Sequence, residues 1–449
     1  MAAETVSMEK RVPNKVLWHI LPLTILGMAV AYVDRTNISF AALQMNKDLG
    51  LSAAAYGLGA GLFFIGYFIF EVPSNMIMVK VGARVWLARI MITWGIVTIA
   101  TGFVHNAATF YVLRFLLGAA EAGFFPGCLL YATYWTTQRE RAFMSGSFLA
   151  GGQVGSLIGA PLAGWILSAT HGAIGLPGWR WLFIIEGAMA VVMAIIFMSA
   201  LDNRPEEAKW LEPEEKTWLL ERLKADREAA GGPRQEHENL ASALRLLWNP
   251  RFLFYSFVYF VCMLVSWGLV FWTPLVFKGV AQYLTTVQIG WLGALPPLAL
   301  ITTMTLWSRH SDLTNERHWH FTIGASVCAI GIIMLINAHT LAMTVGGMSL
   351  AFLGMGGTTP ILWAHFNKGL GTAESAVGLA MINSIGNLGG FVGPYLMGAF
   401  KDATGGYVGG MWVFLVLLVL IIFIMQPSFM GAARASRVGS GGKSGDLPN

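Results

Sequence analysis

Charged residues are scarce in this chain of 449 residues. Asp, Glu, Lys and Arg together make up 12% of it, about half of their usual share in water-soluble domains. Hydrophobic residues make up 55%, and the mean hydropathy is +0.61. A membrane-spanning helix requires about 20 mostly apolar residues. The composition therefore excludes a single water-soluble core and predicts an all-α membrane protein of about twelve transmembrane helices.

Cysteine is also rare, and it occurs at no spacing that is typical of a metal site. This excludes a disulfide framework and a zinc site. The joints between the apolar segments contain no nucleophile motif, no phosphate-binding loop and no paired metal ligands, so the sequence does not favour an enzyme and predicts no cofactor. The three cysteines lie in separate apolar stretches, as Cys128, Cys262 and Cys328.

Residues 1–15 lack a short apolar segment that ends at a small-residue cleavage site, so we expect no signal peptide and a retained first span. Polar joints separate the apolar segments along the rest of the chain. The predicted spans are 17–41, 54–78, 85–104, 107–135, 142–167, 180–201, 251–277, 285–308, 320–338, 341–366, 375–400 and 410–430.

Basic residues are concentrated in every second joint. By the positive-inside rule, this predicts that both termini are cytoplasmic and that the protein spans the cell (inner) membrane. The same distribution argues against a nucleic-acid partner, despite a net charge of +5. Membrane lipid is the surrounding partner instead. The basic joints carry Lys80, Arg84, Arg139, Arg141, Arg309, Arg317 and Lys368.

One long joint, 202–250, divides six spans from six. It contains 11 acidic and 8 basic residues, so it cannot lie in lipid. A proline followed by an apolar stripe predicts a helix that begins at Pro213, which either braces the two halves or lies in a solvated linker. The predicted domains are an N-terminal bundle at 1–201, this cytoplasmic linker, a C-terminal bundle at 251–430 and a flexible cytoplasmic tail at 431–449.

The two halves resemble each other, as expected for a duplicated transporter. Glycine-rich stretches with a proline occur in spans four and five and again in spans ten and eleven. Pro126 and Pro161 are 35 residues apart, and Pro360 and Pro394 are 34 apart. The repeat offset is therefore 234 residues from Pro126 to Pro360, which predicts two pseudo-symmetric six-helix bundles.

Charged residues inside the spans are the most informative feature, because a charge in a spanning helix is costly and rarely persists without a partner or a function. Spans seven to twelve hold none well inside. Asp34 and Arg35 are adjacent, so their side chains project about 100° apart on one helix. Arg114 and Glu121 are about two turns apart on one face. Further charges within spans are Glu71, Arg180 and Glu186.

Two interpretations of the central four charges remain open. In one, Asp34, Arg35, Arg114 and Glu121 neutralise each other and only fix the packing of the helices. In the other, a carboxylate takes up a proton when its arginine turns to a substrate anion, because an arginine stabilises the charged form of an acid and burial disfavours it. Proton-coupled symport requires such an exchange. The sequence favours the second interpretation, and it favours structural roles for Glu71 and Glu186.

Uncharged polar residues of the second half supply candidates for substrate contact. Asn383 and Asn387 are four residues apart on span eleven and offer donors and acceptors on one helix face. In the first half, Tyr67 lies one turn before Glu71 and so points along a plausible face of the cavity. Trp363 lies in span ten, where an aromatic side chain could also be core.

Four segments in spans one to six carry a resemblance: YVDRTNISFA, FEVPSNMIMVKVGARVWL, RFLLGAAEAGFFPG and GWRWLFIIEG. Together they resemble the major facilitator superfamily and, within it, the anion:cation symporter family. The loop motif after span two keeps Gly82 and Arg84 but has Val79 where the superfamily usually carries an aspartate. The charge contact that this aspartate makes between the bundles is then not expected, and Glu71 would replace it in part. The resemblance implies a gating or structural role for Glu71 and Arg84.

The resemblance implies import of a small organic anion, such as a sugar acid, tartrate or an aromatic acid, together with protons and by alternating access. It further implies that Asp34 and Glu121 couple protons and that Arg35 and Arg114 hold the substrate or pair with these acids. The remaining cavity residues it implies are Tyr32, Tyr67, Gln153, Trp363 and Asn383.

Three classes of function are therefore considered. The first is a proton-coupled symporter for an organic carboxylate, functional as a monomer. The second is an exporter or exchanger of the same fold. The third, a membrane-embedded enzyme or receptor, is disfavoured because the spans repeat and the joints lack catalytic motifs.

Overall fold

The computed structural model describes residues 2–229, 248–369 and 375–441, and within these ranges it contains helices and no strand. The N-terminal half consists of the six predicted spans. Its helices are α1 (Ala2–Asp48), α2 (Ala53–Val81), α3 (Ala83–Thr101), α4 (Ala107–Glu121), α5 (Phe124–Trp135), α6 (Gln138–Ala169) and α7 (Gly178–Ala200).

The described parts of the long joint and of the C-terminal half are also helical. The joint contains α8 (Pro213–Ala229), which begins at the proline that the sequence indicated. The helices of the C-terminal half are α10 (Pro250–Val280), α11 (Thr286–Gly293), α12 (Leu295–Thr314), α13 (His318–Ile336), α14 (Leu341–Gly369), α15 (Ser375–Asn387), α16 (Gly389–Thr404) and α17 (Val408–Gly441).

Ten helical segments of the described ranges are long and apolar enough to cross a membrane. The two other predicted spans correspond to α6 and to α15 together with α16. These helices pack beside the ten segments, α6 against α1 and α16 against α2 and α10. All twelve predicted spans therefore have a helical counterpart.

Three of the predicted spans are interrupted, which the sequence analysis did not anticipate. Between α4 and α5 the backbone leaves the helical conformation. Between α11 and α12, at Ala294, and between α15 and α16, at Leu388, the helical hydrogen-bond pattern is interrupted while the backbone dihedrals stay helical. At the first break Gly123 has a φ of 89°, and a Cβ on it would lie 2.4 Å from the hydroxyl oxygen of Ser74. A residue with a side chain is disfavoured there on both counts. At the second break Pro296 follows closely and cannot donate to the preceding turn.

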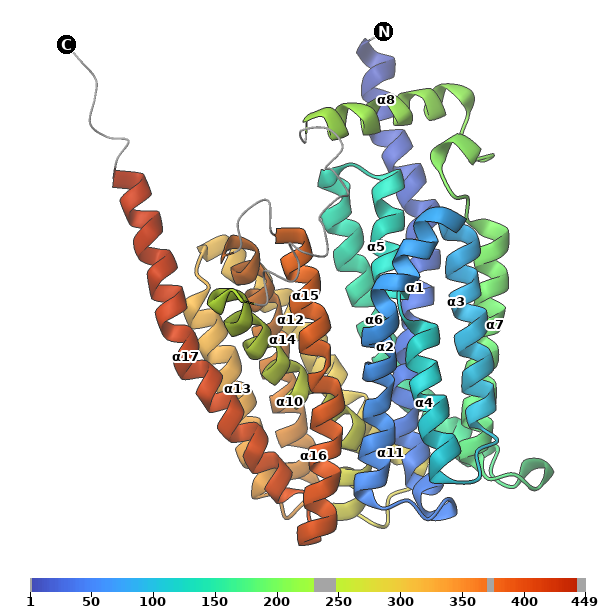
Figure 1. Ribbon diagram of the computed structural model, residues 1–449, viewed down its shortest axis with the longest axis vertical. Helices are drawn as coiled ribbons and strands as arrows, with labels where there is room; N and C mark the ends of the chain where they lie inside the picture. Colours follow the sequence, from blue (N-terminus) through green and yellow to red (C-terminus); the bar gives the residue numbers. More distant parts are fainter. Residues whose placement is uncertain (1, 230–247, 370–374, 442–449) are drawn as a thin grey trace.

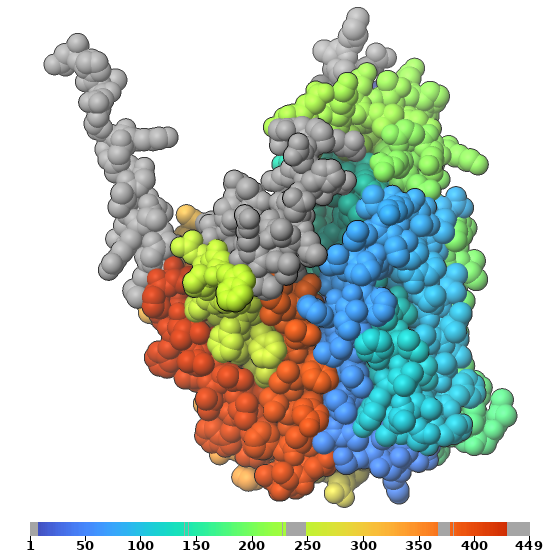
Figure 2. All heavy atoms as spheres, viewed as in Figure 1, coloured from blue at the N-terminus to red at the C-terminus, as the bar shows by residue number. Residues whose placement is uncertain are grey.

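The two halves stand side by side, with the N-terminal half in blue to green and the C-terminal half in yellow-green to red (Figures 1 and 2). α1 begins and α17 ends at the same end of the molecule, where α8 also lies (Figure 1). We call this the α8 end and the opposite one the far end. Helices of the two halves meet as α2 with α16, α6 with α11 and α1 with α10.

Large apolar side chains point outward from many helices, as expected where lipid rather than water is the solvent. A water-soluble monomer rarely exposes so much contiguous apolar surface. The exposed aromatic residues on the spanning helices include Phe70, Trp165, Trp291, Trp319, Trp412 and Phe423.

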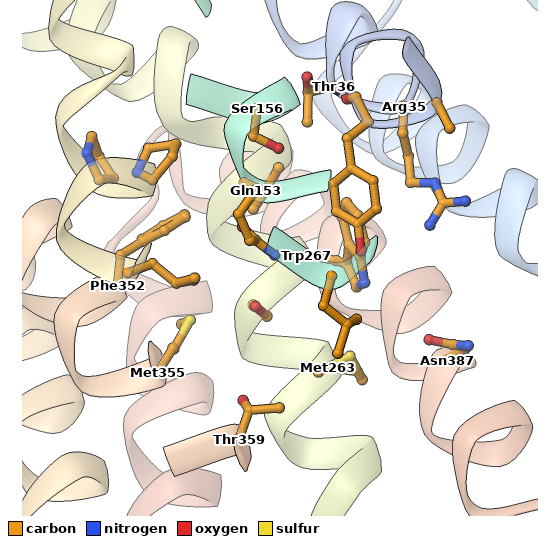
Figure 3. A pocket seen from close by; sticks show the side chains of 18 of the residues that line it. Arg35, Thr36, Gln153, Ser156, Met263, Trp267, Phe352, Met355, Thr359 and Asn387 are labelled. Carbon is orange, nitrogen blue, oxygen red and sulfur yellow. Dashed lines mark hydrogen bonds between the residues drawn. The ribbon is translucent and has the colours of Figure 1, made fainter. Parts of the chain in front are cut away.

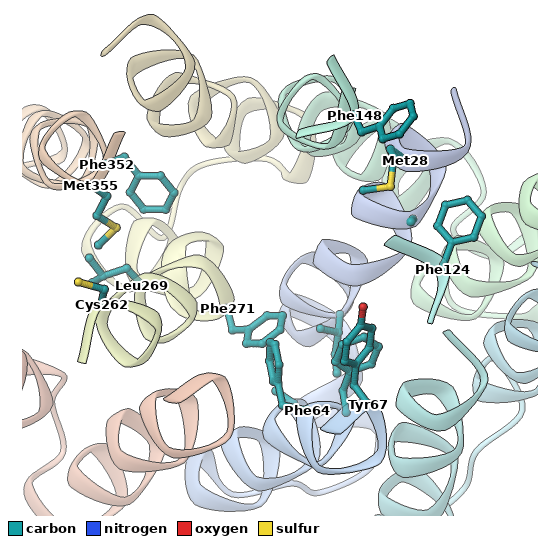
Figure 4. Packing of buried hydrophobic residues seen from close by; sticks show 14 of the residues in the cluster. Met28, Phe64, Tyr67, Phe124, Phe148, Cys262, Leu269, Phe271, Phe352 and Met355 are labelled. Atoms are coloured by element: carbon teal, nitrogen blue, oxygen red, sulfur yellow. The ribbon is translucent and has the colours of Figure 1, made fainter. Parts of the chain in front are cut away.

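The buried core runs through both halves and across their junction (Figure 4). At the junction Phe64 on α2 faces Phe271 on α10, with the ring centroids 6.2 Å apart. Within the N-terminal half Phe124 at the start of α5 packs edge-on against Trp94, at 5.0 Å between centroids. Aromatic contacts of this kind fix the helices that carry the charged residues.

Helix α8 packs on the N-terminal half. Its Glu215 is 1% exposed and lies 2.7 Å from the amino group of Lys15 and 3.0 Å from the guanidinium of Arg11, both on α1. Arg222 lies 3.2 Å from Glu140 at the start of α6. These ion pairs hold α8 to the N-terminal half.

Candidate functional site

A cavity of about 450 Å³ lies between the two halves. In the N-terminal half its wall is formed by α1, α2, the break between α4 and α5, and α6. In the C-terminal half it is formed by α10, α12, α14 and α15. In Figure 3, Arg35 on α1 and Asn387 on α15 lie on different sides of this space. A cavity between two repeats near the middle of the helices is where transporters of this architecture bind their substrates.

Most of the residues that the sequence singled out line this cavity. Eight of the predicted site residues do so, and they come from both halves. They are Tyr32, Arg35, Tyr67, Glu121, Gln153, Trp363, Asn383 and Asn387.

Arg35 and Glu121 form an ion pair at the cavity wall. The Nη2 atom of Arg35 donates a hydrogen bond to Oε1 of Glu121. The Arg35 side chain is 13% exposed, while that of Glu121 is 1% exposed. Among the described residues, neither Nε of Arg35 nor Oε2 of Glu121 has a hydrogen-bond partner. The pair therefore retains one donor and one acceptor, which a substrate and a proton could satisfy.

The local fold at Glu121 explains its access to the cavity. Glu121 is the last residue of α4, because the chain turns away at Gly123. The preceding part of α4 packs against α2. The carboxylate therefore projects from a helix end rather than from the middle of a packed helix face.

Four aromatic rings surround the guanidinium of Arg35. Its Cζ lies 5.3 Å from the ring centroid of Tyr32, 5.1 Å from Phe63, 5.4 Å from Tyr67 and 5.9 Å from Trp267. Such rings stabilise a cation through their π faces and exclude water from it. The sequence analysis missed Phe63 and Trp267, because an aromatic residue in an apolar span carries no signal that separates cavity from core.

Asp34, the neighbour of Arg35, points away from the cavity. Its side chain is 1% exposed and accepts hydrogen bonds from the hydroxyl of Thr98 on α3 at 3.1 Å and from the amide of Asn37 at 3.3 Å. Adjacent residues on a helix project about 100° apart, so one of the two faces α3 while the other faces the cavity. Asp34 and Arg35 therefore do not open into one common space in this conformation.

Arg114 also lies outside the cavity wall. It is fully buried, and its guanidinium donates to the backbone carbonyls of Gly59 and Ala60 on α2, each at 3.4 Å. Seven residues of α-helix separate it from Glu121, a rise of about 10 Å. The two residues share a helix face, but only Glu121 reaches the cavity.

Glu71 and Arg84 take different positions. Glu71 accepts a hydrogen bond at 3.1 Å from the hydroxyl of Ser384 on α15, so its partner comes from the other half of the molecule. Arg84 stays within the N-terminal half, where its Nε donates to the carbonyl of Met198 at 2.6 Å. Glu71 thus joins the two halves on the α8 side of the cavity, and Arg84 ties α3 to α7.

The two halves are held together more closely at the far end. Asp402 on α16 accepts hydrogen bonds from the backbone amides of Ala53 and Ala54 at 3.0 and 2.8 Å, at the start of α2. Tyr56 donates to the carbonyl of Phe271 on α10 at 2.9 Å. These contacts join the two halves at the far end of the molecule.

The C-terminal wall of the cavity carries no acidic or basic side chain among the described residues. Asn383 and Asn387 supply amide groups, and Ser266 and Thr359 supply hydroxyls. The rest of this wall is mainly apolar and sulfur-containing or aromatic, with Met263, Trp267, Phe352 and Met355 labelled in Figure 3. In the described ranges no group of three His, Cys, Asp or Glu residues lies close enough to hold a metal ion.

The chain belongs to the major facilitator superfamily, whose family model matches residues 24–394. A putative tartrate transporter of Agrobacterium vitis is 42% identical over 413 residues, which cover 92% of this chain and 93% of that protein. The putative metabolite transport protein NicT of Pseudomonas putida is 40% identical and covers 93% and 94%. A quinolone resistance transporter of Acinetobacter baumannii is 37% identical, with the same coverage. This protein is therefore a transporter and not an enzyme.

Solved structures show the same fold at much lower sequence identity. A bacterial homologue of the human lysosomal transporter Spinster, in an inward-facing and unoccupied conformation, gives a TM-score of 0.75 at 18% identity and covers 95% of this chain and 98% of its own. A D-xylose-proton symporter gives 0.72 at 15% identity, with coverages of 91% and 97%. The predicted twelve-helix major facilitator fold is thereby confirmed.

Proposed function

We propose that this protein imports a small organic anion by proton symport, through alternating access of its two halves to a central cavity. The observation that supports this most directly is the Arg35–Glu121 ion pair at the cavity wall. It places one cation and one acid within reach of a bound solute. The proposal includes an orientation in the inner membrane with both termini in the cytoplasm, and a monomer as the functional unit.

The pair supports an exchange of partners. A substrate carboxylate that binds Arg35 replaces Glu121 as the acceptor of the guanidinium. Glu121 is 1% exposed, and a buried carboxylate that loses its cation is unfavourable unless it takes up a proton. Anion binding at Arg35 and proton binding at Glu121 thus favour each other. Release of either one restores the ion pair.

The C-terminal wall supports recognition of the rest of the solute. Asn383 and Asn387 offer amide donors and acceptors, while Trp267 and Met263 offer apolar contact beside Arg35. Two of the relatives are named for tartrate and for a metabolite. The substrate class that fits both walls is a small carboxylate with hydroxyl groups or an aromatic ring, such as tartrate, a sugar acid or an aromatic acid.

The test is uptake into proteoliposomes with and without an inward proton gradient. Radiolabelled tartrate, a sugar acid and an aromatic acid are compared, each with the wild-type protein and with Glu121→Gln. We expect the gradient to drive accumulation of at least one of these acids in the wild type only. Accumulation by the Glu121→Gln variant that equals the wild type would disprove the proposed coupling.

A second candidate function is export or exchange. It is supported by the aromatic and methionine lining of the C-terminal wall and by the relative named for quinolone resistance. The same proteoliposomes distinguish the two functions. Proton-driven extrusion of a quinolone, without accumulation of any carboxylate, would favour the exporter.

A further inference from the structure

Glu186 on α7 is a buried acid that the proposed exchange at Arg35 does not use. Its side chain is 1% exposed, and neither of its carboxylate oxygens has an aligned hydrogen bond from the described residues. An ionised carboxylate without a donor or a cation is strongly unfavourable in an apolar interior. Glu186 therefore requires a charged partner or a proton.

The charged group that acts on Glu186 is a second acid. Asp34 lies close enough to interact with it electrostatically, and the Asn37 side chain lies beside it. Arg35, Arg114 and Glu121 act on Asp34. On α3, the helix packed against α7, the residue that contacts Asp34 is Thr98, which does not titrate. Two acids therefore face each other with an amide between them.

The packing around Glu186 leaves little room for water to solvate its charge. The next residue, Gly187, faces Gly95 on α3, and a Cβ added to either glycine would lie 2.6 Å from the carbonyl oxygen of the other. Backbones that approach this closely exclude a layer of water between the helices. Solvent therefore does not replace the missing partner.

The hydrogen bonds of Asn37 show that this cluster lacks one hydrogen-bond donor. Its Nδ2 donates to Oδ1 of Asp34 at 3.3 Å, and its own Oδ1 has no donor although the residue is 1% exposed. The amide nitrogen of Asn37 also interacts with Glu186 as a hydrogen-bond donor, so one donor serves two acids. One added proton on Glu186 removes its unpaired charge and gives the unpaired Oδ1 of Asn37 a donor once the amide turns toward it.

We propose that Asp34 and Glu186 form a second proton-binding site, in which the two carboxyl groups hold one proton between them and Asn37 bridges them. With the proton on Glu186, the Asn37 amide accepts from Glu186 and donates to Asp34. With the proton on Asp34, the amide turns and donates to Glu186. The site lies behind the cavity wall and is separate from the Arg35–Glu121 pair. Only its coupling to transport rests on the proposed function.

Infrared spectroscopy of the purified full-length protein, without substrate, tests the proton itself. Glu215 on α8 provides a control, because its side chain is likewise 1% exposed but lies within 3.0 Å of Lys15 and Arg11, which favour its ionised form. We expect Glu186→Gln to remove a carbonyl band of a protonated carboxyl group at neutral pH and Glu215→Gln to remove none. If Glu186→Gln leaves that band unchanged, the proposal is wrong. Failure of organic-anion uptake would not change this result.

The pH dependence of uptake tests the coupling of this site to transport. In Glu186→Gln, Asp34 loses an acidic neighbour that favours proton uptake, so the pH of half-maximal uptake should move about one unit lower. Glutamine still offers a donor to Asn37, so the variant would keep the wild-type pH profile if Glu186 had a purely structural role. An unchanged profile would therefore overturn the coupling. Asn37→Leu removes the donor to Asp34 and leaves Glu186 in place, so it should move the profile the other way, to higher pH; an unshifted profile would contradict the bridging role.

Discussion

The N-terminal and C-terminal halves share a helix arrangement but differ in their buried polar residues. The N-terminal half buries acids and arginines inside its helices, whereas the buried polar residues of the C-terminal half, within the described ranges, are serine, threonine and histidine. In the cavity, the charged pair comes from one half and uncharged donors and acceptors come from the other. The duplicated fold has thus divided the proposed work, with proton chemistry and the anchor for the anion in one half and recognition of the rest of the solute in the other.

This division has a mechanical consequence. If the two halves rock as rigid bodies, distances within one half do not change during the cycle. The Arg35–Glu121 pair then responds to the solute and the proton rather than to the movement itself. Contacts between the halves, such as Glu71 with Ser384, are the ones that the movement must break. The following predictions test this comparison, from the largest expected effect to the smallest.

Removal of the cavity arginine should have the largest effect. In Arg35→Gln the buried Glu121 loses its cation and the substrate loses its anchor, so the initial rate of uptake should fall roughly 100-fold or more. The matched control is Arg309→Gln, an exposed arginine on α12 of the other half, which should transport at the wild-type rate. Wild-type uptake by Arg35→Gln would remove the basis for placing the anion site in the N-terminal half.

Neutralising Glu121 should separate the proton from the solute. In Glu121→Gln, Arg35 still binds the anion, so exchange of labelled for unlabelled substrate should continue while accumulation against a gradient is lost. The measurement is counterflow and gradient-driven uptake in the same vesicles. If the correctly folded variant loses both counterflow and gradient-driven uptake, Glu121 acts in binding rather than in coupling.

Substitutions in the C-terminal wall should change recognition alone. Asn383→Ala and Asn387→Ala each remove hydrogen bonds to the solute, which should raise the KM roughly tenfold. The dependence of uptake on pH should stay as in the wild type, because these residues do not titrate. A shifted pH profile in either variant would break the proposed division between the halves.

The bond between the halves at Glu71 should have a smaller effect. Ser384→Ala removes one hydrogen bond, worth about 1 kcal/mol, and should shift the population away from the present conformation about fivefold. Spin labels placed on the two halves near the α8 end can measure this shift by their distance distribution. Ser199→Ala, at an exposed serine that bonds only within α7, is the control and should leave the distribution unchanged.

The smallest effect concerns α8 and low pH. Burial alone raises the pKa of Glu215, but hydrogen bonds from Lys15 and the backbone of Glu212 and the charge of Arg11 hold that pKa below its usual value of 4.5. A lowered pKa adds stability that is complete above 4.5 and is lost as the pH falls through the lowered value. We expect this lost stabilisation of α8 to be about 1 kcal/mol, which should appear as faster proteolysis of α8 at acid pH. Unchanged proteolysis in Glu215→Gln at neutral pH would contradict this.

Much of the fold could be predicted because membrane insertion imposes simple rules. Long apolar segments must be helices, since every backbone group needs a partner in lipid. Their number and the division into two halves follow from the sequence. The breaks at Gly123, Ala294 and Leu388 did not, because a local turn inside an apolar segment leaves the hydropathy unchanged. The break at Gly123 is the one that brings Glu121 to the cavity.

The candidate site was predictable in its residues more than in its geometry. Buried charge is costly enough to identify Arg35 and Glu121 from sequence. The direction of each side chain depends on helix rotation, which sequence spacing gives only relative to a neighbour. Asp34 therefore faces α3 although Arg35 faces the cavity, and Glu186 becomes significant only once it lies beside Asp34.

The hydrogen bonds that Asp402 accepts from the first amides of α2 also provide a built-in reporter of conformation. A helix N-terminus leaves its first amides without partners inside the helix, and here the acceptor for Ala53 and Ala54 comes from the other half. When the far end opens, those two amides lose their acceptor and meet solvent. Their hydrogen–deuterium exchange should therefore follow the fraction of molecules that are open at the far end, without any label attached to the protein.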